Sequence, residues 1–290
     1  MFLRKFELKI GDDAGDGLDF SSLHVQFSVE KKDSATPNSA RITIFNVAQS
    51  TVAQVQKEFN TVYLSAGYED NCAAIFHGTI QKVVFARENG TDGILTIAAG
   101  DGDVAHNFAV VNKTLAAGAT QKDVISAASA EYEKNGTTAG FSADFETRAL
   151  PRGKVMFGMA RDFMQSGALN SQTNFSVQDG KTQFVKENGA LPDEAYVLNS
   201  ATGLIGSPMQ TTDGVQCTCL LNPRFKIGSV VQIAEKDITE SIDSDESSAL
   251  AADGYYRIYS LNFDGDTHGN DWYCNFVGVS LDATTMQTTD

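Results

Sequence analysis

Four cysteines are the first side chains in this sequence that could do chemistry, because thiolates bind metals. Cys217 and Cys219 would point to the same side of a strand. A structural zinc site needs four ligands, usually with wider spacing between paired cysteines, and Cys72 and Cys274 lie far away without a histidine cluster. We therefore favour small buried side chains over a metal site and predict no metal-binding residues.

The acidic run from Asp264 to Asp271 has the composition of a loop that binds a divalent cation. If Asp264 takes the first position of an EF-hand loop, Asn275 takes the last, where a bidentate glutamate belongs. The run from Asp12 to Asp19 fails in the same way, because Leu23 would take the last position. Solvated turns are the favoured interpretation of both runs, and a nonspecific calcium site stays open as an alternative.

Motifs of enzyme active sites are absent from the sequence. It contains no G-x-S-x-G elbow, phosphate-binding loop, dinucleotide fingerprint or H-E-x-x-H helix. The histidines fall in separate predicted segments: His24, His77, His106 and His268. A hydrolase would need a carboxylate pair, which is defined by its separation in space. The carboxylates to inspect for that alternative are Asp123, Glu131, Asp144 and Glu146. We predict no enzyme, no catalytic residues and no cofactor.

A glycan-binding β module is a second alternative, because aromatic side chains near the end of the chain could stack on sugars. They are Trp272, Tyr255, Tyr256, Tyr259 and Tyr273. In alternating strands, half of these side chains should point into the core instead.

Charge excludes several classes of partner. The chain has 37 acidic and 22 basic residues, a net charge of −15, which argues against gripping DNA or anionic lipid. Residues 11–20 contribute −4 and residues 235–253 contribute −6, so the acidity is concentrated in two predicted loops. No stretch approaches the ~20 apolar residues of a membrane span.

Hydrophobic periodicity divides the chain into three regions, which must position any site. Residues 1–110 read as alternating strands with one short helix capped by Ser50 or Thr51. Residues 111–195 read as an α+β module with helices near 120–133 and 154–165 and a hairpin on Asp179-Gly180. Residues 196–290 return to strands. The predicted fold class is mainly β, with two barrels and an inserted α+β module.

Several blocks, in order, resemble bacteriophage tail baseplate hub proteins, the tail-tube-like hub family of contractile-tail phages and related injection machines. The linkage of Leu221-Asn-Pro223 to Gly228-Ser-Val-Val before a strand is the most specific. The other blocks include Arg41–Val47, Val62–Tyr68, Ile75–Ile80, Asp101–Asp103, Thr202–Pro208, Gly254–Ile258, Gly265–Thr267 and Asp271–Trp272.

The resemblance implies two tail-tube-like β-barrel domains, 1–110 and 196–290, around the middle module 111–195. It implies a structural virion protein of the tail baseplate, assembled in the host cytoplasm. Three chains would form a ring that adapts the six-fold tail tube to the three-fold spike. The partners it implies are the tail tube protein, the central spike protein, the tape-measure protein and other baseplate proteins. DNA would pass through the lumen without specific binding, and the net charge suggests an acidic lumen wall that repels phosphates.

Overall fold

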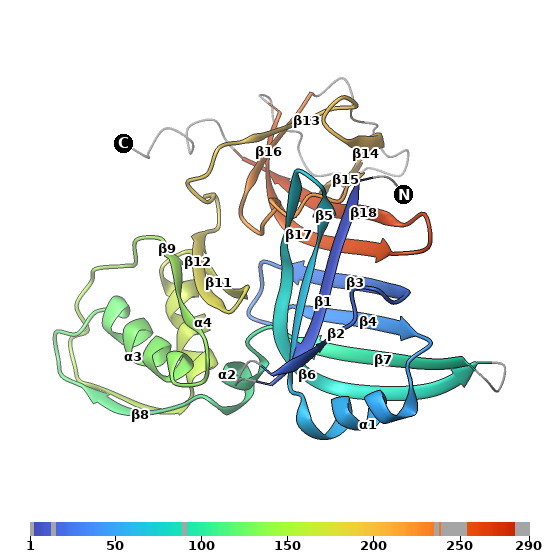
Figure 1. Ribbon diagram of the computed structural model, residues 1–290. Helices are drawn as coiled ribbons and strands as arrows, with labels where there is room; N and C mark the ends of the chain where they lie inside the picture. Colours follow the sequence, from blue (N-terminus) through green and yellow to red (C-terminus); the bar gives the residue numbers. More distant parts are fainter. Residues whose placement is uncertain (1–2, 13–15, 89–91, 235–237, 239–253, 282–290) are drawn as a thin grey trace.

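The computed structural model describes residues 3–12, 16–88, 92–234, 238 and 254–281 (Figure 1). Its strands and helices follow the order β, α+β, β, and the prediction of a mainly β chain is confirmed. The acidic segment 235–253 lies outside the described residues apart from Ile238, as do residues 13–15 of the first acidic loop.

The N-terminal region of the chain holds seven strands and one helix. They are β1 (Arg4–Gly11), β2 (Gly17–Asp19), β3 (Val25–Lys32), β4 (Ser39–Phe45), α1 (Gln49–Glu58), β5 (Thr61–Tyr68), β6 (Asn71–Glu88) and β7 (Asp92–Gly100). The expected cap of α1 is wrong: Ala48 is the N-cap residue and makes no side-chain cap, while Ser50 lies inside the first turn. Burial of Val52 and Val55 against the sheet holds this helix instead.

The middle region is a compact α+β module with its own core. Its elements are α2 (Asp103–Phe108), β8 (Val110–Leu115), α3 (Gln121–Glu133), β9 (Thr138–Ser142), β10 (Lys154–Met159), α4 (Ala160–Asn170), β11 (Thr173–Gln178) and β12 (Lys181–Lys186). The predicted capping box of α3 is confirmed, since Thr120 and Asp123 bond each other's backbone amides. The predicted hairpin is confirmed as β11–β12, with Asp179 and Gly180 both at positive φ.

The helix predicted over 154–165 is wrong in its first half. Residues 154–159 form β10, which pairs with β8, and α4 begins only at Ala160. Along β10 the side chains alternate, with Met156 buried while Val155 and Phe157 are 72% and 75% exposed. When both faces of a short strand carry apolar side chains, its hydrophobic pattern over six residues resembles that of an apolar helix face. Periodicity therefore did not distinguish strand β10 from a helix.

The C-terminal region of the chain joins the N-terminal region in one sheet. Its strands are β13 (Tyr196–Leu198), β14 (Leu204–Thr211), β15 (Gly214–Leu220), β16 (Val230–Ile233), β17 (Tyr255–Asp266) and β18 (Trp272–Ser280). The order is β14-β15-β18-β17-β3-β4-β7-β6-β5-β1-β2, and the antiparallel pair β17–β3 joins the two regions. One continuous core of buried side chains lies beneath both regions.

The topology repeats within this sheet, although the residues show no repeat. In the N-terminal region the hairpin β3–β4 lies beside the hairpin β6–β7, with β4 next to β7. In the C-terminal region the hairpin β14–β15 lies beside the hairpin β17–β18, with β15 next to β18. Along the sheet, β14-β15-β18-β17 therefore has the same order as β3-β4-β7-β6. In addition, β5 pairs with the start of β6 as β16 pairs with the start of β17.

The middle module is attached to the sheet by a buried polar network. Asp101, 2% exposed, accepts hydrogen bonds from the backbone amides of Asp179 and Gly180 at 2.6 and 2.8 Å. Lys31 Nζ lies 2.5 Å from an Asp179 carboxylate oxygen. The predicted boundaries 110/111 and 195/196 stay predictions, while the module's core spans residues 105–184.

Candidate functional site

The exposed face of the eight-strand run β14-β15-β18-β17-β3-β4-β7-β6, called the polar face below, spans both β regions. In β3 the buried side chains of Val25, Phe27 and Val29 alternate with Gln26 and Ser28 on the other face. The register extends this alternation across neighbouring strands, because directly paired residues share a face. One row crosses the junction between the two β regions: Tyr273, Asp264, Ser28, Arg41, Ala98 and Lys82.

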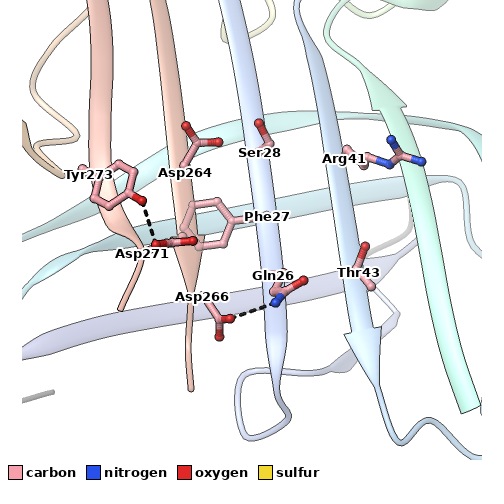
Figure 2. A pocket seen from close by; sticks show the side chains of 10 residues that line it. Gln26, Phe27, Ser28, Arg41, Thr43, Asp264, Asp266, Asp271 and Tyr273 are labelled. Carbon is pink, nitrogen blue, oxygen red and sulfur yellow. Dashed lines mark hydrogen bonds between the residues drawn. The ribbon is translucent and has the colours of Figure 1, made fainter. Parts of the chain in front are cut away.

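This polar face is hollowed around the junction of β17 and β3. A depression of about 370 Å³ is lined by side chains from β17, β3, β4 and the start of β18. Figure 2 shows Asp264, Ser28 and Arg41 side by side across adjacent strands, with the bond from Gln26 to Asp266 drawn below them. A second depression of about 510 Å³ shares Ser28 and Arg41 and continues towards β6.

The charges on the polar face nearly balance. Among the side chains that the structure describes there, three are cationic (Lys32, Arg41 and Lys82) and four are anionic (Glu30, Asp264, Asp266 and Asp271). The net charge of −15 therefore does not arise on this face. The hypothesis of an acidic lumen wall loses its basis if this face lines the channel.

Asp266 is the most strongly perturbed carboxyl on the polar face. Burial raises its pKa, but hydrogen bonds from Gln26, from the amides of His268 and Gly269, and from His24 outweigh burial and lower the pKa to about 2. The His24 and His268 rings lie 4.6 Å apart, although the sequence separates them widely. The bonds from the His268 and Gly269 amides close the turn after β17.

The carboxylates inspected for a hydrolase are not gathered in one site. Asp123 is engaged in the cap of α3, where Thr120 lowers its pKa by hydrogen bonding. Glu131, further along the same helix, pairs with Lys134 at 2.6 Å. Only Asp144 and Glu146 line a common depression, on the module surface. Their geometry identifies no acid–base pair.

The cysteines have structural surroundings. Cys217, Cys219 and Cys274 are buried, and the sulfur atoms of Cys219 and Cys274 lie 3.3 Å apart across β15 and β18. Cys72, in contrast, is exposed, which the sequence pattern did not indicate. In the described residues, no group of three or more potential ligands is placed to hold a metal ion.

Two of the five aromatic side chains considered for sugar stacking, Trp272 and Tyr256, lie in the core. Trp272 is only 2% exposed and donates its indole N–H to the carbonyl of Gly67 at 3.1 Å. Tyr256 is buried, whereas Tyr259 is exposed and Tyr273 donates to Asp271 at 2.6 Å. As expected from alternation, the aromatic residues divide between the core and the surface.

Across the stretches of chain that the structure describes, every helix is too short or too polar to cross a bilayer.

Sequence patterns did not reveal the polar face as a unit. Period-two alternation in β3 and β4 indicated which side chains face outward, but nothing local indicated that β17 pairs with β3.

Comparison with known proteins shows what the chain is similar to. The family model described as "Baseplate hub gp41" matches residues 39–278. No curated protein sequence matches the chain. A 43 kDa tail protein of prophage MuSo2 from Shewanella oneidensis has a similar structure, with a TM-score of 0.62 and 9% identity, covering 96% of this chain and 97% of that chain.

Two further solved structures share the fold. A tail protein from Neisseria meningitidis MC58 gives a TM-score of 0.61 at 8% identity, covering 98% of this chain and 99% of that chain. An Escherichia coli component of the type VI secretion system gives 0.55 at 8% identity, covering 95% of this chain and 77% of that one. The TM-scores show a common fold, and at identities this low the likeness extends to the fold alone. The resemblance predicted from the sequence is confirmed by the family match over most of the chain, and the protein belongs to the baseplate hub gp41 family of phage tail structural proteins.

Proposed function

We propose that this protein is a homotrimeric, non-enzymatic baseplate hub that adapts the six-fold tail tube to the three-fold spike. The observation that carries the proposal is the internal repeat: each chain presents two four-strand units in the same spatial order. Three chains with two such units would offer six quasi-equivalent units to the tube. The two units would correspond to the two tube-like barrel domains, with the middle module inserted between them.

The polar face of the eight-strand run would line the channel for the tape-measure protein and the genome. Its charged side chains nearly balance, with three cations and four carboxylates in the described residues. Clustered Lys and Arg would hold phosphates. The carboxylates of Glu30, Asp264, Asp266 and Asp271 offset the cations of this face. This near-neutrality favours passage of DNA without specific binding, in place of the acidic repulsion expected from composition.

The middle module would contact the spike or another baseplate protein. The end of α2 and the small sheet β8–β10 expose apolar side chains, with Phe108, Val155 and Phe157 70%, 72% and 75% exposed. Exposed apolar patches of this kind mark protein interfaces. The hub would be assembled in the host cytoplasm and located in the virion tail. In the particle, the spike or another baseplate protein would cover this patch.

Imaging of the native assembly tests the proposal. Electron microscopy of isolated tails should place the protein as a three-fold ring on the tube axis, with the polar face towards the lumen. Sedimentation of the purified protein provides the mass, 31.1 kDa for one chain or three times that value for the trimer. The hub role would be refuted if each tail contained a single copy of the protein, or if the protein lay away from the tube axis.

A further inference from the structure

Three of the cysteines gather on the buried side of the sheet in the C-terminal region. Cys217 and Cys219 lie on β15 and Cys274 lies on β18, and each is at most 1% exposed. The register of β15 with β18 places Cys219 directly opposite Cys274, whereas Cys217 lies opposite Phe276. Other small apolar side chains would fill the same space, so packing alone does not require thiols at these positions.

Cys219 and Cys274 have the geometry that precedes a disulfide bond. Their sulfur atoms lie 3.3 Å apart, and each sulfur also contacts a backbone carbonyl, that of Cys274 at 3.6 Å and that of Leu220 at 3.4 Å. Directly opposed residues of an antiparallel pair have Cα atoms about 4.5–5.5 Å apart, within the range of about 4.4–6.8 Å that a disulfide spans. The sulfur atoms must approach by about 1.2 Å to bond, a distance that small rotations of the two side chains cover.

Cys217 provides an internal comparison, because it is equally buried but has no cysteine opposite it. Along an extended strand its Cα lies about 6.8 Å from that of Cys219, at the outer limit for a disulfide. The folded sheet therefore selects Cys274 as the partner of Cys219, although these two residues are 55 positions apart in the sequence. In the unfolded chain this selection is lost, and pairs close in the sequence are favoured because they close shorter loops.

We propose that Cys219 and Cys274 form an oxidation site, at which a small peroxide converts the two thiols into a disulfide that joins β15 to β18. One sulfur attacks a peroxide oxygen, the O–O bond breaks, and the sulfur becomes a sulfenic acid as one water leaves. The second sulfur attacks the first, and the hydroxyl group leaves with the remaining thiol proton as a second water. The two thiols lose two protons and two electrons, and one hydrogen peroxide is reduced to two waters.

Burial determines how fast this site reacts and which oxidants reach it. The hydrogen bond with Cys274, and then burial, raise the pKa of Cys219, so its reactive thiolate form is scarce. Hydrogen peroxide is similar in size to water, whereas oxidised glutathione is too large to reach sulfur atoms that are at most 1% exposed. We therefore expect slow oxidation by hydrogen peroxide and none by oxidised glutathione in the native protein.

The disulfide would join two hairpins that only strand pairing and packing connect at present. β15 belongs to the hairpin β14–β15 and β18 to the hairpin β17–β18. The closed loop would contain β16 and β17, and β17 is the strand that pairs with β3. A cross-link over so long a loop restricts the unfolded chain and stabilises the folded one. The inference does not depend on the hub proposal, since the pair lies within one chain.

Mass spectrometry tests the pairing. In a Cys72→Ser background, native protein is incubated with hydrogen peroxide, unfolded in urea without reductant and alkylated with iodoacetamide. We expect alkylation of Cys217 alone, in place of the three cysteines that this background retains, and a tryptic link between the peptides that contain Cys219 and Cys274. The mass before alkylation should fall by about 2 Da. The melting temperature should rise by about 5 °C, and dithiothreitol should reverse both changes.

Two variants in the same background separate the pair from its neighbour. Cys217→Ser keeps the pair and should give the same disulfide, whereas Cys274→Ser should leave Cys217 and Cys219 alkylatable after peroxide treatment. If Cys274→Ser does not fold, the Cys217→Ser variant decides. The proposal is wrong if native protein keeps three alkylatable cysteines after an exposure about tenfold longer than one that pairs the cysteines of the urea-unfolded chain. A link between Cys217 and Cys219 in native protein, or one formed equally well by oxidised glutathione, would also overturn it.

Discussion

Replacement of Asp101 by alanine should loosen the middle module from the sheet. The Asp101 carboxylate is 2% exposed and accepts two backbone amides from the β11–β12 turn, at 2.6 and 2.8 Å. Asp101→Ala removes the acceptor of both partly buried amides, which costs about 1–3 kcal/mol each. Burial, and then the neighbouring Asp179 carboxylate, raise the pKa of Asp101, so removal of its charge offsets some of this cost.

The net expectation is a loss of about 2–4 kcal/mol in the free energy of unfolding. Urea unfolding followed by circular dichroism measures it, with limited proteolysis to locate the loosened module. Asp144→Ala, an exposed carboxylate on the same module, is the matched control and should change stability by less than about 0.5 kcal/mol. If Asp101→Ala unfolds within about 0.5 kcal/mol of wild type, the buried network does not hold the module and the reasoning is refuted.

Three further predictions concern pH, thiols and a glycine. The pKa of Asp266 is lowered to about 2, so its stabilisation is present above the unfolded-state value of 3.8 and is lost as pH falls towards 2. Asp266→Asn should lower the free energy of unfolding at pH 7 by up to about 2 kcal/mol. It should also weaken the dependence of stability on pH in the acid range, and an unchanged acid unfolding transition would contradict this. Iodoacetamide should label native protein once, at Cys72, because Cys217 is buried with its pKa raised to about 12 and the other two thiols are also buried; mass spectrometry before and after urea checks this. Gly214→Ala should cost at least about 2 kcal/mol, because φ is +137° and the new Cβ would lie 2.3 Å from a β18 backbone oxygen. Gly136→Ala, where φ is +90° with open space around it, should cost less, and equal thermal unfolding shifts for the two variants would contradict the steric argument.

Local patterns predicted many elements of this fold correctly. Strict alternation indicated β3, the Thr120–Asp123 box indicated α3, and Asp179-Gly180 indicated the β11–β12 hairpin. Each of these signals acts between residues close in the sequence, where propensity and turn chemistry dominate. The same reasoning mistook β10 for a helix, because its partner β8 lies outside any local window.

The candidate site was less accessible to sequence-based reasoning. Which side chains face outward on β3 follows from alternation, but their neighbours on β17 come from more than 200 positions away. The same holds for Asp266, whose low pKa depends on His24 and Gln26 across the junction. Strand pairing at such distance is selected by burial of the whole sheet, which no motif encodes.

Composition and local pattern were enough to predict the mainly β character, the α+β insertion and the family resemblance. Three-dimensional pairing was needed to show that both β regions share one sheet, that they repeat each other's strand order, and that the polar face is nearly charge-balanced. The physical reason is that a repeat of backbone topology requires only matched alternation of buried and exposed residues along the strands. Residue identities were therefore free to diverge until the repeat vanished from the sequence. For example, the register of β6 with β7 shifts just before Lys82, whereas the register of β17 with β18 shifts just before Ser260.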